Sequence, residues 1–321
     1  MTSFFVDRLY QGTRLDHYLV ERLIVYSRSE IQAAIAAGKV HVNDKRVTPH
    51  FQLRFKDKIL FDESTPVRKE HKPLHERPPR AFKPQQAPRV IAETNQYFIL
   101  DKPAGWLMHA SDGKDRAPLI TDFILDLDPA IAVVGDSPDI RPGIVHRLDR
   151  EVSGIVVIPR TQQFFDHIKQ QFINKTVRKT YQALVFGSPA KDEETISFRI
   201  ARSRRKARMA ALPAHQSDGK DATTHFVVKE RFQHTTHLEV WVETGRTNQI
   251  RVHLAAYNIP IVGDVMYGQR TPANESVGRV MLHADYITFY DLGGSKVEYR
   301  SELPKEFTAL LERGRKTKAK G

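Results

Sequence analysis

Proline residues crowd one stretch of this chain, residues 66–89, together with many arginines and lysines. Proline fixes φ and has no backbone N–H, so this density excludes a helix or a paired strand and favours an extended, semi-rigid spacer. We therefore predict a basic linker at residues 66–89 that separates a small module, residues 1–65, from a large domain, residues 90–305. Residues 306–321 form a basic tail, and we expect it to be frayed from Arg313 to Lys320, where apolar spacing is lacking.

The charge balance indicates a polyanionic partner. The 321 residues include 50 Lys and Arg against 38 Asp and Glu, a formal net charge of +12. Cations attract nucleic acid because each neutralised phosphate releases counterions; the alternative is charge that only keeps the protein in solution. The chain has no cysteine, which excludes disulfides, thiolate metal sites and cysteine nucleophiles.

The chain has no segment typical of a membrane or secretory protein. No run approaches about 18 apolar residues, and the first residues do not form a signal peptide. A hydrophobic content of 40% is ample for a core. We expect a soluble, cytoplasmic protein that does not contact a membrane.

Residues 14–61 have the pattern of a compact module. Leu15, Leu19 and Leu23 recur at helical spacing, and Gly38 is suited to end a second helix as a left-handed cap. Short alternating segments follow and predict small strands.

Two short helices followed by small strands resemble the S4 RNA-binding domain. Arg14, Arg28 and Lys39 lie near the expected helix ends. Helix N-termini and clustered cations suit phosphates, so we expect this S4-like α/β module to hold an RNA backbone more than to read bases. A small helical cap with ordinary surface charge is the alternative.

Residues 142–158 contain the most plausible chemical centre. Asp149 lies among the basic residues His146, Arg147 and Arg150, and an apolar run that predicts a buried strand follows. Cations within a few ångströms favour the ionised form, so we expect a carboxylate at neutral pH. The alternative is a surface ion-pair loop that caps the strand.

Three stretches in order resemble the RluA-type pseudouridine synthases. Residues 101–109 read DKPAGWLMH, residues 146–154 read HRLDREVSG, and residues 244–254 read TGRTNQIRVHL, with Gly-Asp at 263–264. The resemblance covers roughly residues 90–305. Val152 departs from it, because the family usually has Thr there and the hydroxyl beside the acid is lost.

The large domain mixes helix and strand patterns without a steady βαβ rhythm. We expect a strand at 96–100, a helix at 118–133, a helix capped by Thr161 with core-facing phenylalanines, and a strand at 179–185. This favours an α+β class with a mixed, largely antiparallel sheet. The pseudouridine synthase fold, which the resemblance implies, belongs to the same class.

The resemblance implies roles for three site residues. Asp149 would be the catalytic carboxylate, and the family mechanism has it attack the sugar, attack the base, or deprotonate C2′. Tyr181 would stack on uracil and accept or relay the C5 proton. Arg251 would keep the carboxylate ionised and oriented; on chemistry alone Arg246 could do so, and the Gln-Ile-Arg match favours Arg251.

Other cations are expected to contact RNA. By resemblance, Arg147 would enter the gap left when the target base is extruded. Arg246 and Lys102 are candidates for phosphate contacts. A dense basic stretch at 199–208, which includes Arg204 and Arg205, is a candidate phosphate-binding patch, with a solvated loop as the alternative.

The sequence therefore predicts an RNA pseudouridine synthase that acts on structured RNA, with ribosomal RNA preferred over transfer RNA. We expect a monomer that needs no cofactor, metal or dinucleotide. The histidines have no spacing typical of a metal-ligand pair. A catalytic triad of Ser153, His146 and Asp149 is disfavoured, because the three residues share one loop and no nucleophile elbow is present. The alternatives are a catalytically silent S4-type ribosome-assembly factor, a synthase directed at transfer RNA, and an unrelated RNA hydrolase.

Overall fold

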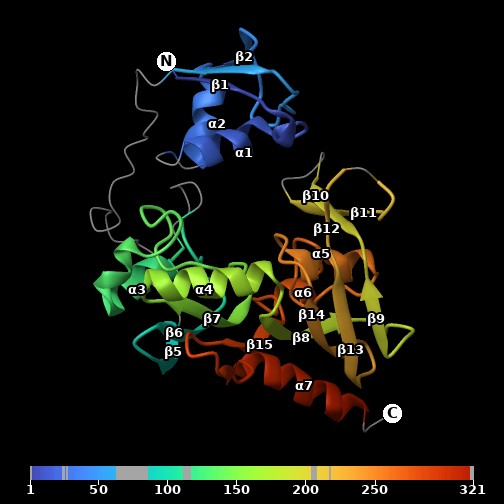
Figure 1. Cartoon of the computed structure of the whole chain (residues 1–321). Coiled ribbons are helices and arrows are strands. Elements are labelled where there is room, and N and C mark those ends of the chain that lie inside the picture. Colours follow the sequence, from blue (N-terminus) through green and yellow to red (C-terminus); the bar gives the residue numbers. More distant parts are fainter. Residues whose placement is uncertain are drawn as a thin grey trace. The chain divides into compact units, whose positions relative to one another are not determined.

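The computed structural model describes residues 2–23, 26, 28–62, 86–110, 117–203, 208–216 and 218–318 (Figure 1). The chain divides into two compact units, Met1–Arg77 and Pro78–Gly321. Most of the predicted linker lies outside the described residues, as do Arg204, Arg205 and the side chain of Arg28. The domain boundaries drawn from the sequence therefore stay predictions.

The first unit packs two helices against an antiparallel sheet. The helices are α1 (Leu15–Arg22) and α2 (Arg28–Ala36), and a short 3-10 turn (Arg8–Tyr10) precedes them. The sheet order is β1 (Thr2–Phe5), β4 (Lys58–Phe61), β2 (Val40–Val42) and β3 (Lys45–Arg46). Leu15, Leu19 and Leu23 are all buried in its core, which confirms the helical spacing.

Gly38 ends helix α2 as predicted. Its φ is +74°, and the N–H groups of Gly38 and Lys39 donate to the carbonyls of Ile35 and Ala34, both at 3.0 Å. This is the bonding pattern of a left-handed glycine cap, which satisfies carbonyls that the helix end leaves open.

The second unit is built on a nine-stranded sheet. In spatial order its strands are β5 (Arg89–Glu93), β6 (Tyr97–Lys102), β7 (Ser153–Pro159), β15 (Leu282–Tyr290), β8 (Arg178–Phe186), β14 (Thr235–Val242), β13 (Thr224–Arg231) and β9 (Glu193–Ile196), with β16 (Lys296–Arg300) also paired to β15. The β7–β15 pair is parallel, and the other pairs of this sheet are antiparallel. The expected largely antiparallel α+β sheet is confirmed.

Strand β15 joins two halves of this sheet. The strands β5, β6 and β7 lie on one side of it, and β8, β14, β13 and β9 lie on the other. The late strand β15 therefore brings together segments that are far apart in the chain (Figure 1).

Both faces of β7 are buried. Ile155 and Val157 pack in a cluster with Phe164 and Ile168 of helix α4 (Gln162–Ile173), and Val156 and Ile158 of the same strand belong to the larger core cluster with helix α3 (Ile120–Leu127). A strand that is covered on both sides reads as a continuous apolar run instead of an alternating one. The predicted buried strand after Asp149 is confirmed.

Helix α4 begins as the sequence indicates. The Thr161 hydroxyl accepts a hydrogen bond from the N–H of Phe164 at 3.2 Å. Phe164, Phe165 and Ile168 are buried, and Phe172 is partly buried against the same core. The aromatic side chains of this helix are core residues, as predicted.

Two expectations about helices are wrong. The predicted helix at 118–133 ends at Leu127, and a 3-10 turn at Pro129–Val133 follows, because proline disfavours helical geometry in the residue before it. The tail is not frayed as far as it is described: residues Lys305–Lys318 form helix α7, whose Phe307 and Leu311 are buried.

The second unit also contains two short helices and a separate small sheet. Helices α5 (Gln249–Ala256) and α6 (Pro272–Glu275) are short, and a separate small sheet has the order β11 (Met209–Leu212), β10 (Arg199–Arg202) and β12 (Lys220–Asp221). Among the described residues, no helix is both long and apolar enough to cross a bilayer.

Candidate active site

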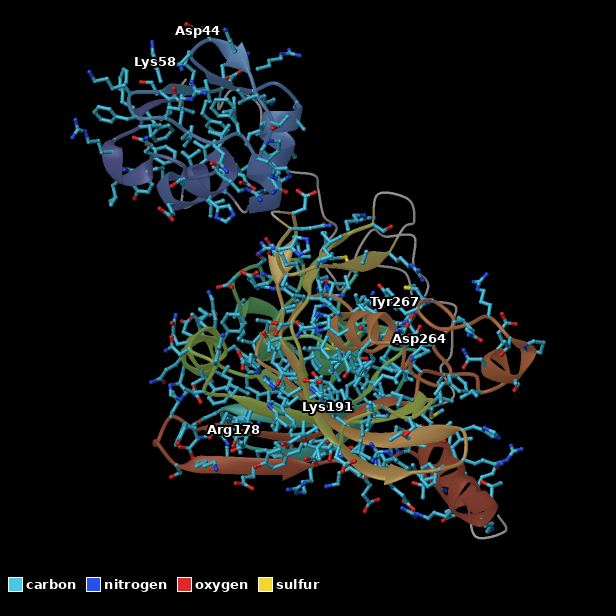
Figure 2. The ribbon with its side chains drawn as sticks, turned by 90° about the vertical axis from the view of Figure 1, so that its right-hand side faces the viewer. Asp44, Lys58, Arg178, Lys191, Asp264 and Tyr267 are labelled. Atoms are coloured by element: carbon cyan, nitrogen blue, oxygen red, sulfur yellow. The ribbon has the colours of Figure 1, made fainter. Side chains whose placement is uncertain are left out.

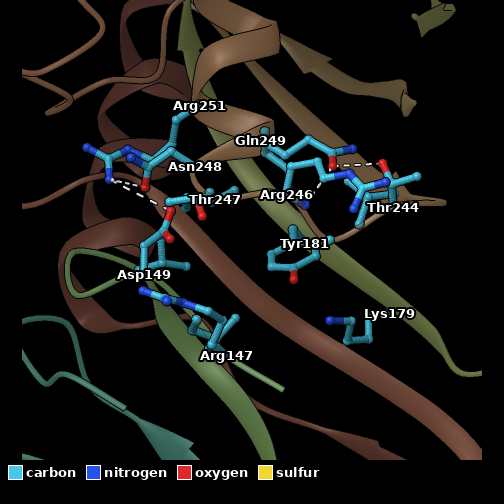
Figure 3. Close-up of a pocket in the computed structure, with 16 residues that line it drawn as sticks. Arg147, Asp149, Lys179, Tyr181, Thr244, Arg246, Thr247, Asn248, Gln249 and Arg251 are labelled. Carbon is cyan, nitrogen blue, oxygen red and sulfur yellow. Dashed lines mark hydrogen bonds and ion pairs between the residues drawn. The ribbon is translucent and has the colours of Figure 1, made fainter. Parts of the chain in front are cut away.

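A small pocket, with a cavity volume of about 80 Å³, opens where the two halves of the large sheet meet (Figure 3). Its lining comes from the loop before β7, from β8, from the segment between β14 and α5, and from the first residue of β15. Asp149, Tyr181 and Arg251, the three residues predicted to be catalytic, all line it. Arg147 and Arg246 line it as well.

Asp149 lies in the turn that leads into β7. The N–H of Val152 donates to the Asp149 carbonyl at 3.2 Å, and the Val152 side chain is buried in the core cluster. The turn is thus held by its backbone and by apolar packing. The hydroxyl that the family usually carries at position 152 is not needed for the turn to close.

Gly154 allows this turn to lie against β15. Its φ is +122°, and a Cβ at this position would lie 2.2 Å from the carbonyl oxygen of Ala284. Gly154 and Ala284 are paired in the parallel β7–β15 contact. Only glycine permits this approach, which fixes the start of β7 and hence the position of Asp149.

Burial governs the electrostatics of Asp149. Its side chain is 17% exposed, and burial raises the pKa of Asp149 above its usual value. The guanidinium groups of Arg251 and Arg147 oppose this rise, as the sequence suggested, but they do not cancel it. A carboxylate with a raised pKa is a stronger base and nucleophile than an exposed one.

The main partner of Arg251 is Asp264 and not Asp149. Its Nε and Nη2 donate to the two Asp264 oxygens at 2.7 and 3.0 Å, and Nη1 donates to Glu151 at 3.0 Å. Its closest approach to Asp149 is 3.8 Å. Burial alone would lower the pKa of Arg251, but the hydrogen bonds and charge of Asp264 outweigh it, so the pKa rises and Arg251 stays a cation.

Asn248 makes the close polar contact to Asp149. With its amide nitrogen toward the carboxylate, it donates to both Asp149 oxygens at 2.7 and 3.1 Å, and its oxygen accepts from the Tyr267 hydroxyl at 2.9 Å. This orientation gives up only a long 3.4 Å contact with Arg251. The two amide ends then both face complementary partners.

Tyr181 faces the pocket from β8. The residue is buried, and Figure 3 shows it between Asp149 and Lys179. Lys179 also lines the pocket, and its ammonium lies 5.3 Å from the centroid of the Phe172 ring. A phenol and an acid therefore face one small space from two different segments of the chain.

A buried amide holds the segment that carries Arg246. The Gln249 Oε1 accepts from the Thr244 hydroxyl at 2.8 Å and from the Arg246 N–H at 3.0 Å, and its Nε2 donates to Thr223 and Thr224 (Figure 3). The Arg246 side chain also donates to the carbonyl of Asp221 at 3.1 Å. Arg246 is therefore oriented at the pocket edge.

Lys102 does not lie where it could meet a phosphate, and that expectation is wrong. Its side chain is fully buried, and its ammonium donates to the carbonyls of Trp106 at 2.9 Å, Pro103 at 3.2 Å and Arg150 at 3.4 Å. Burial lowers its pKa to about 7. Lys102 ties the 103–106 turn to the loop that bears Asp149.

The other predicted RNA contacts have mixed placements. In the first unit, Arg14 is half-buried and donates to Asp16 at 3.0 and 2.9 Å, while Lys39 is partly exposed. In the basic stretch, Arg199 donates to Asp221 at 2.5 Å and Arg208 to the carbonyl of Met266. Within the described part of that stretch, Arg199 is therefore paired with a carboxylate and Arg208 with a backbone carbonyl.

Sequence reasoning missed several residues of the site. It gave no role to Asn248, Glu151, Asp264 or Tyr267, although each lies in or just after a motif. It placed His146 beside the acid, whereas the His146 ring accepts a hydrogen bond from the Val157 N–H at 2.9 Å and lies tilted against the Phe172 ring, with 5.0 Å between the ring centroids. The only available signal was that the motifs hold more polar residues than the assigned roles use.

Comparison with known proteins agrees with the motifs. A family described as RNA pseudouridylate synthase matches residues 96–256, and the S4 domain family matches residues 13–59. The uncharacterized RNA pseudouridine synthase YlyB of Bacillus subtilis is 30% identical over 310 residues, which cover 95% of each chain. Ribosomal large subunit pseudouridine synthase D of Yersinia pestis is 31% identical over 316 residues, 94% of this chain and 90% of the relative.

A solved structure supports the fold alone. Human RNA Pseudouridylate Synthase Domain Containing 1 superimposes with a TM-score of 0.57 and 21% identity, covering 73% of this chain and 98% of that one. The predicted pseudouridine synthase fold is confirmed.

Proposed function

This chain belongs to the RNA pseudouridylate synthase family, and from that premise we propose that it isomerises specific uridines in structured ribosomal RNA through Asp149, without a cofactor. The observation that carries the proposal is a buried carboxylate that faces a pocket together with a phenol and a guanidinium. Domains that only bind RNA need no such acid.

The chemistry is an isomerisation in which no atom is lost from the nucleotide. The N1–C1′ bond breaks, the base turns, a C5–C1′ bond forms, C5 loses a proton and N1 gains one. Asp149 acts at the sugar or at the base in the first step, by attack on either or by deprotonation at C2′. Its burial favours all of these routes, because each needs a basic or nucleophilic carboxylate in a site that restricts water.

Tyr181 and Arg251 have separate roles in this proposal. The Tyr181 ring is suited to stack on the uracil, and its hydroxyl can accept the C5 proton. Arg251 is held by Asp264, so it offers a fixed positive charge 3.8 Å from Asp149 instead of a direct hydrogen bond. That charge counters part of the effect of burial on the acid.

Two observations support ribosomal RNA as the substrate. The S4 domain match at residues 13–59 adds an RNA-binding module, and relatives that span most of this chain are named ribosomal large subunit pseudouridine synthases. A uridine inside folded RNA must be extruded before reaction, at a cost of a few kcal/mol. The exposed Arg147 at the pocket is suited to fill the gap that the base leaves.

The remaining cations would hold the RNA backbone. Arg246 at the pocket edge is suited to a phosphate near the target nucleotide. Arg14, Arg28 and Lys39 would serve in the S4-like module, and Arg204 and Arg205 in the basic stretch. These are contacts that position RNA and carry no base specificity.

Carbodiimide mapping of pseudouridine tests the proposal. Total RNA from cells that lack this protein is incubated with the wild type, with Asp149→Asn, or with Asp126→Asn, a matched change at an exposed position of α3. We expect new reverse-transcription stops with the wild type and Asp126→Asn, and none with Asp149→Asn. A wild-type protein that binds RNA but adds no stop would favour the silent assembly factor, and stops in transfer RNA alone would redirect the substrate assignment.

A further inference from the structure

Asn248 contacts Asp149, Tyr267 contacts Asn248, and neither residue has a role in the function proposed above. The backbone N–H of Met209 donates to the Tyr267 hydroxyl oxygen at 3.1 Å. The Tyr267 hydroxyl lies 2.9 Å from the Asn248 amide oxygen, and the amide nitrogen lies 2.7 and 3.1 Å from the Asp149 oxygens. The four groups form one continuous chain of hydrogen bonds, which we call the Met209–Asp149 relay.

The direction of the relay follows from its last member. An ionised carboxylate can only accept, so the Asn248 nitrogen faces Asp149, the Asn248 oxygen accepts from the Tyr267 hydroxyl, and the Tyr267 oxygen accepts from the Met209 N–H. In the opposite orientation the amide oxygen would face the carboxylate, and no hydrogen bond could form because both groups are acceptors.

Both middle members of the relay are held in place. Asn248 has φ +56°, a left-handed geometry that Asn tolerates, and its carbonyl accepts from the N–H of Val252 at 2.9 Å. Tyr267 lies next to Asp264 (Figure 2), and the Tyr267 N–H donates to the Asp264 carboxylate at 3.1 Å. The guanidiniums of Arg251 and Arg208 lie 5.2 and 5.3 Å from the centroid of the Tyr267 ring. A relay with so few free torsions can set the direction of the Asp149 oxygens.

We propose that Asn248 and Tyr267 are positioning residues that hold Asp149 as a carboxylate and aim it into the pocket, with the relay anchored on strand β11. The proposal rests on the proposed function, in which Asp149 is the catalytic carboxylate. It also links the catalytic pocket to strand β11, which pairs with β10.

The other charges around Asp149 provide a constant background. Arg251, Arg147 and Lys102 favour its ionised form, and Glu151 opposes it. None of these four is changed when the relay is cut. A change in the titration of Asp149 after cutting the relay would therefore report on the amide itself.

The chain offers matched controls for both relay members. Asn258 also has a left-handed backbone, with φ +64°, and is exposed beyond α5, so Asn258→Gly is the control for Asn248→Gly. Glycine keeps the positive φ in both and removes only the amide. The Tyr257 hydroxyl contacts Glu194 at 3.3 Å, so Tyr257→Phe is the control for Tyr267→Phe.

The measurement is turnover against pH. Tritium release from ribosomal RNA transcribed with [5-³H]uridine reports the loss of the C5 proton, at saturating and at low RNA. For Asn248→Gly we expect the acid limb of kcat to move up by about one pH unit, because a charge-assisted hydrogen bond to the carboxylate is lost, with KM unchanged. Tyr267→Phe should move it less, and the double variant should match Asn248→Gly alone, since the two residues act in series.

Each alternative outcome is decisive. An unchanged acid limb would overturn the relay, as would additive shifts in the double variant. A limb that moves to lower pH would mean that the amide carbonyl accepts from a protonated Asp149, and would overturn it too. If the wild type releases tritium and Asp149→Asn does not, such results reject the relay alone, whereas a wild type without release rejects the proposed function with it.

Discussion

Removal of Asp264 should destabilise the second unit strongly. Asp264→Ala deletes two charge-assisted hydrogen bonds from Arg251, at 2.7 and 3.0 Å, and the acceptor for the N–H groups of Met266 and Tyr267. Arg251 is only 2% exposed, so water cannot replace the lost partner. Breaking a buried ion pair on one side costs about 3–5 kcal/mol, and we expect about 3 because Glu151 still contacts Arg251.

Tryptophan fluorescence during urea unfolding measures this loss selectively. The chain has 2 Trp, Trp106 and Trp241, and both lie in the second unit, so the signal is not mixed with unfolding of the S4-like module. The free energy of unfolding follows from the midpoint and the slope. In a thermal scan the same loss should lower Tm by roughly 6–12 °C for a domain of this size.

Glu298→Ala is the control for a generic lost ion pair. Glu298 contacts Lys296 at 3.5 Å, and both side chains are about half exposed, so we expect a loss below about 1 kcal/mol. A loss for Asp264→Ala no larger than that of Glu298→Ala would refute the argument that Arg251 depends on Asp264. An Asp264→Asn variant with wild-type stability would show that the charge of Asp264 is not what matters.

Four further predictions concern the pocket and its support. Arg147→Ala should reduce tritium release far more on folded RNA than on a flexible oligonucleotide, and equal losses would discard its role in base extrusion. Gly154→Ala should lower the free energy of unfolding by more than about 2 kcal/mol, because the new Cβ would lie 2.2 Å from the Ala284 oxygen; a smaller loss in urea would contradict this. Burial raises the pKa of Asp149, so the kcat of the wild type should begin to fall with decreasing pH at a pH above about 4, the usual pKa of an exposed aspartate. An acid limb of the kcat profile at or below about pH 4 would exclude a raised pKa for Asp149. Burial lowers the pKa of Lys102 to about 7, so between about pH 7 and 10 its amine is neutral in the folded protein and charged in the unfolded protein. The free energy of unfolding of the wild type, relative to that of Lys102→Met, should therefore rise with pH over this range. A difference that does not change with pH would mean that the buried amine stays charged.

The elements that follow local rules could be predicted from the sequence. The apolar run after Asp149 is buried on both faces, the glycine at position 38 caps a helix, and the Thr161 hydroxyl begins α4. The two helix ends depend on hydrogen bonds between residues close in the sequence, and the burial of the strand is directly visible in its unbroken run of apolar residues. The family resemblance likewise predicted Asp149, Tyr181 and Arg251 as site residues, and all three line one pocket.

Residues whose partners lie far along the chain could not be predicted. The family resemblance implied that Arg251 lies beside the acid, but Arg251 has two closer carboxylates, Asp264 and Glu151, which only the folded loops bring near. Lys102 looked like a phosphate contact because lysine is usually exposed, yet three carbonyls satisfy it inside the protein. Helix α7 was missed because Phe307 and Leu311 are its main buried apolar residues, too few to stand out in a basic tail.

The position of β15 in the sheet has a consequence for synthesis of the protein in the cell. Asp149 precedes β7 and Tyr181 lies on β8, and the strand that fills the space between β7 and β8 begins only at Leu282. A nascent chain still missing its last forty or so residues would lack this strand, since domains complete their long-range pairings only once the whole sequence has emerged. The pocket lined by Asp149, Tyr181 and Leu282 is therefore complete only after β15 has been synthesised.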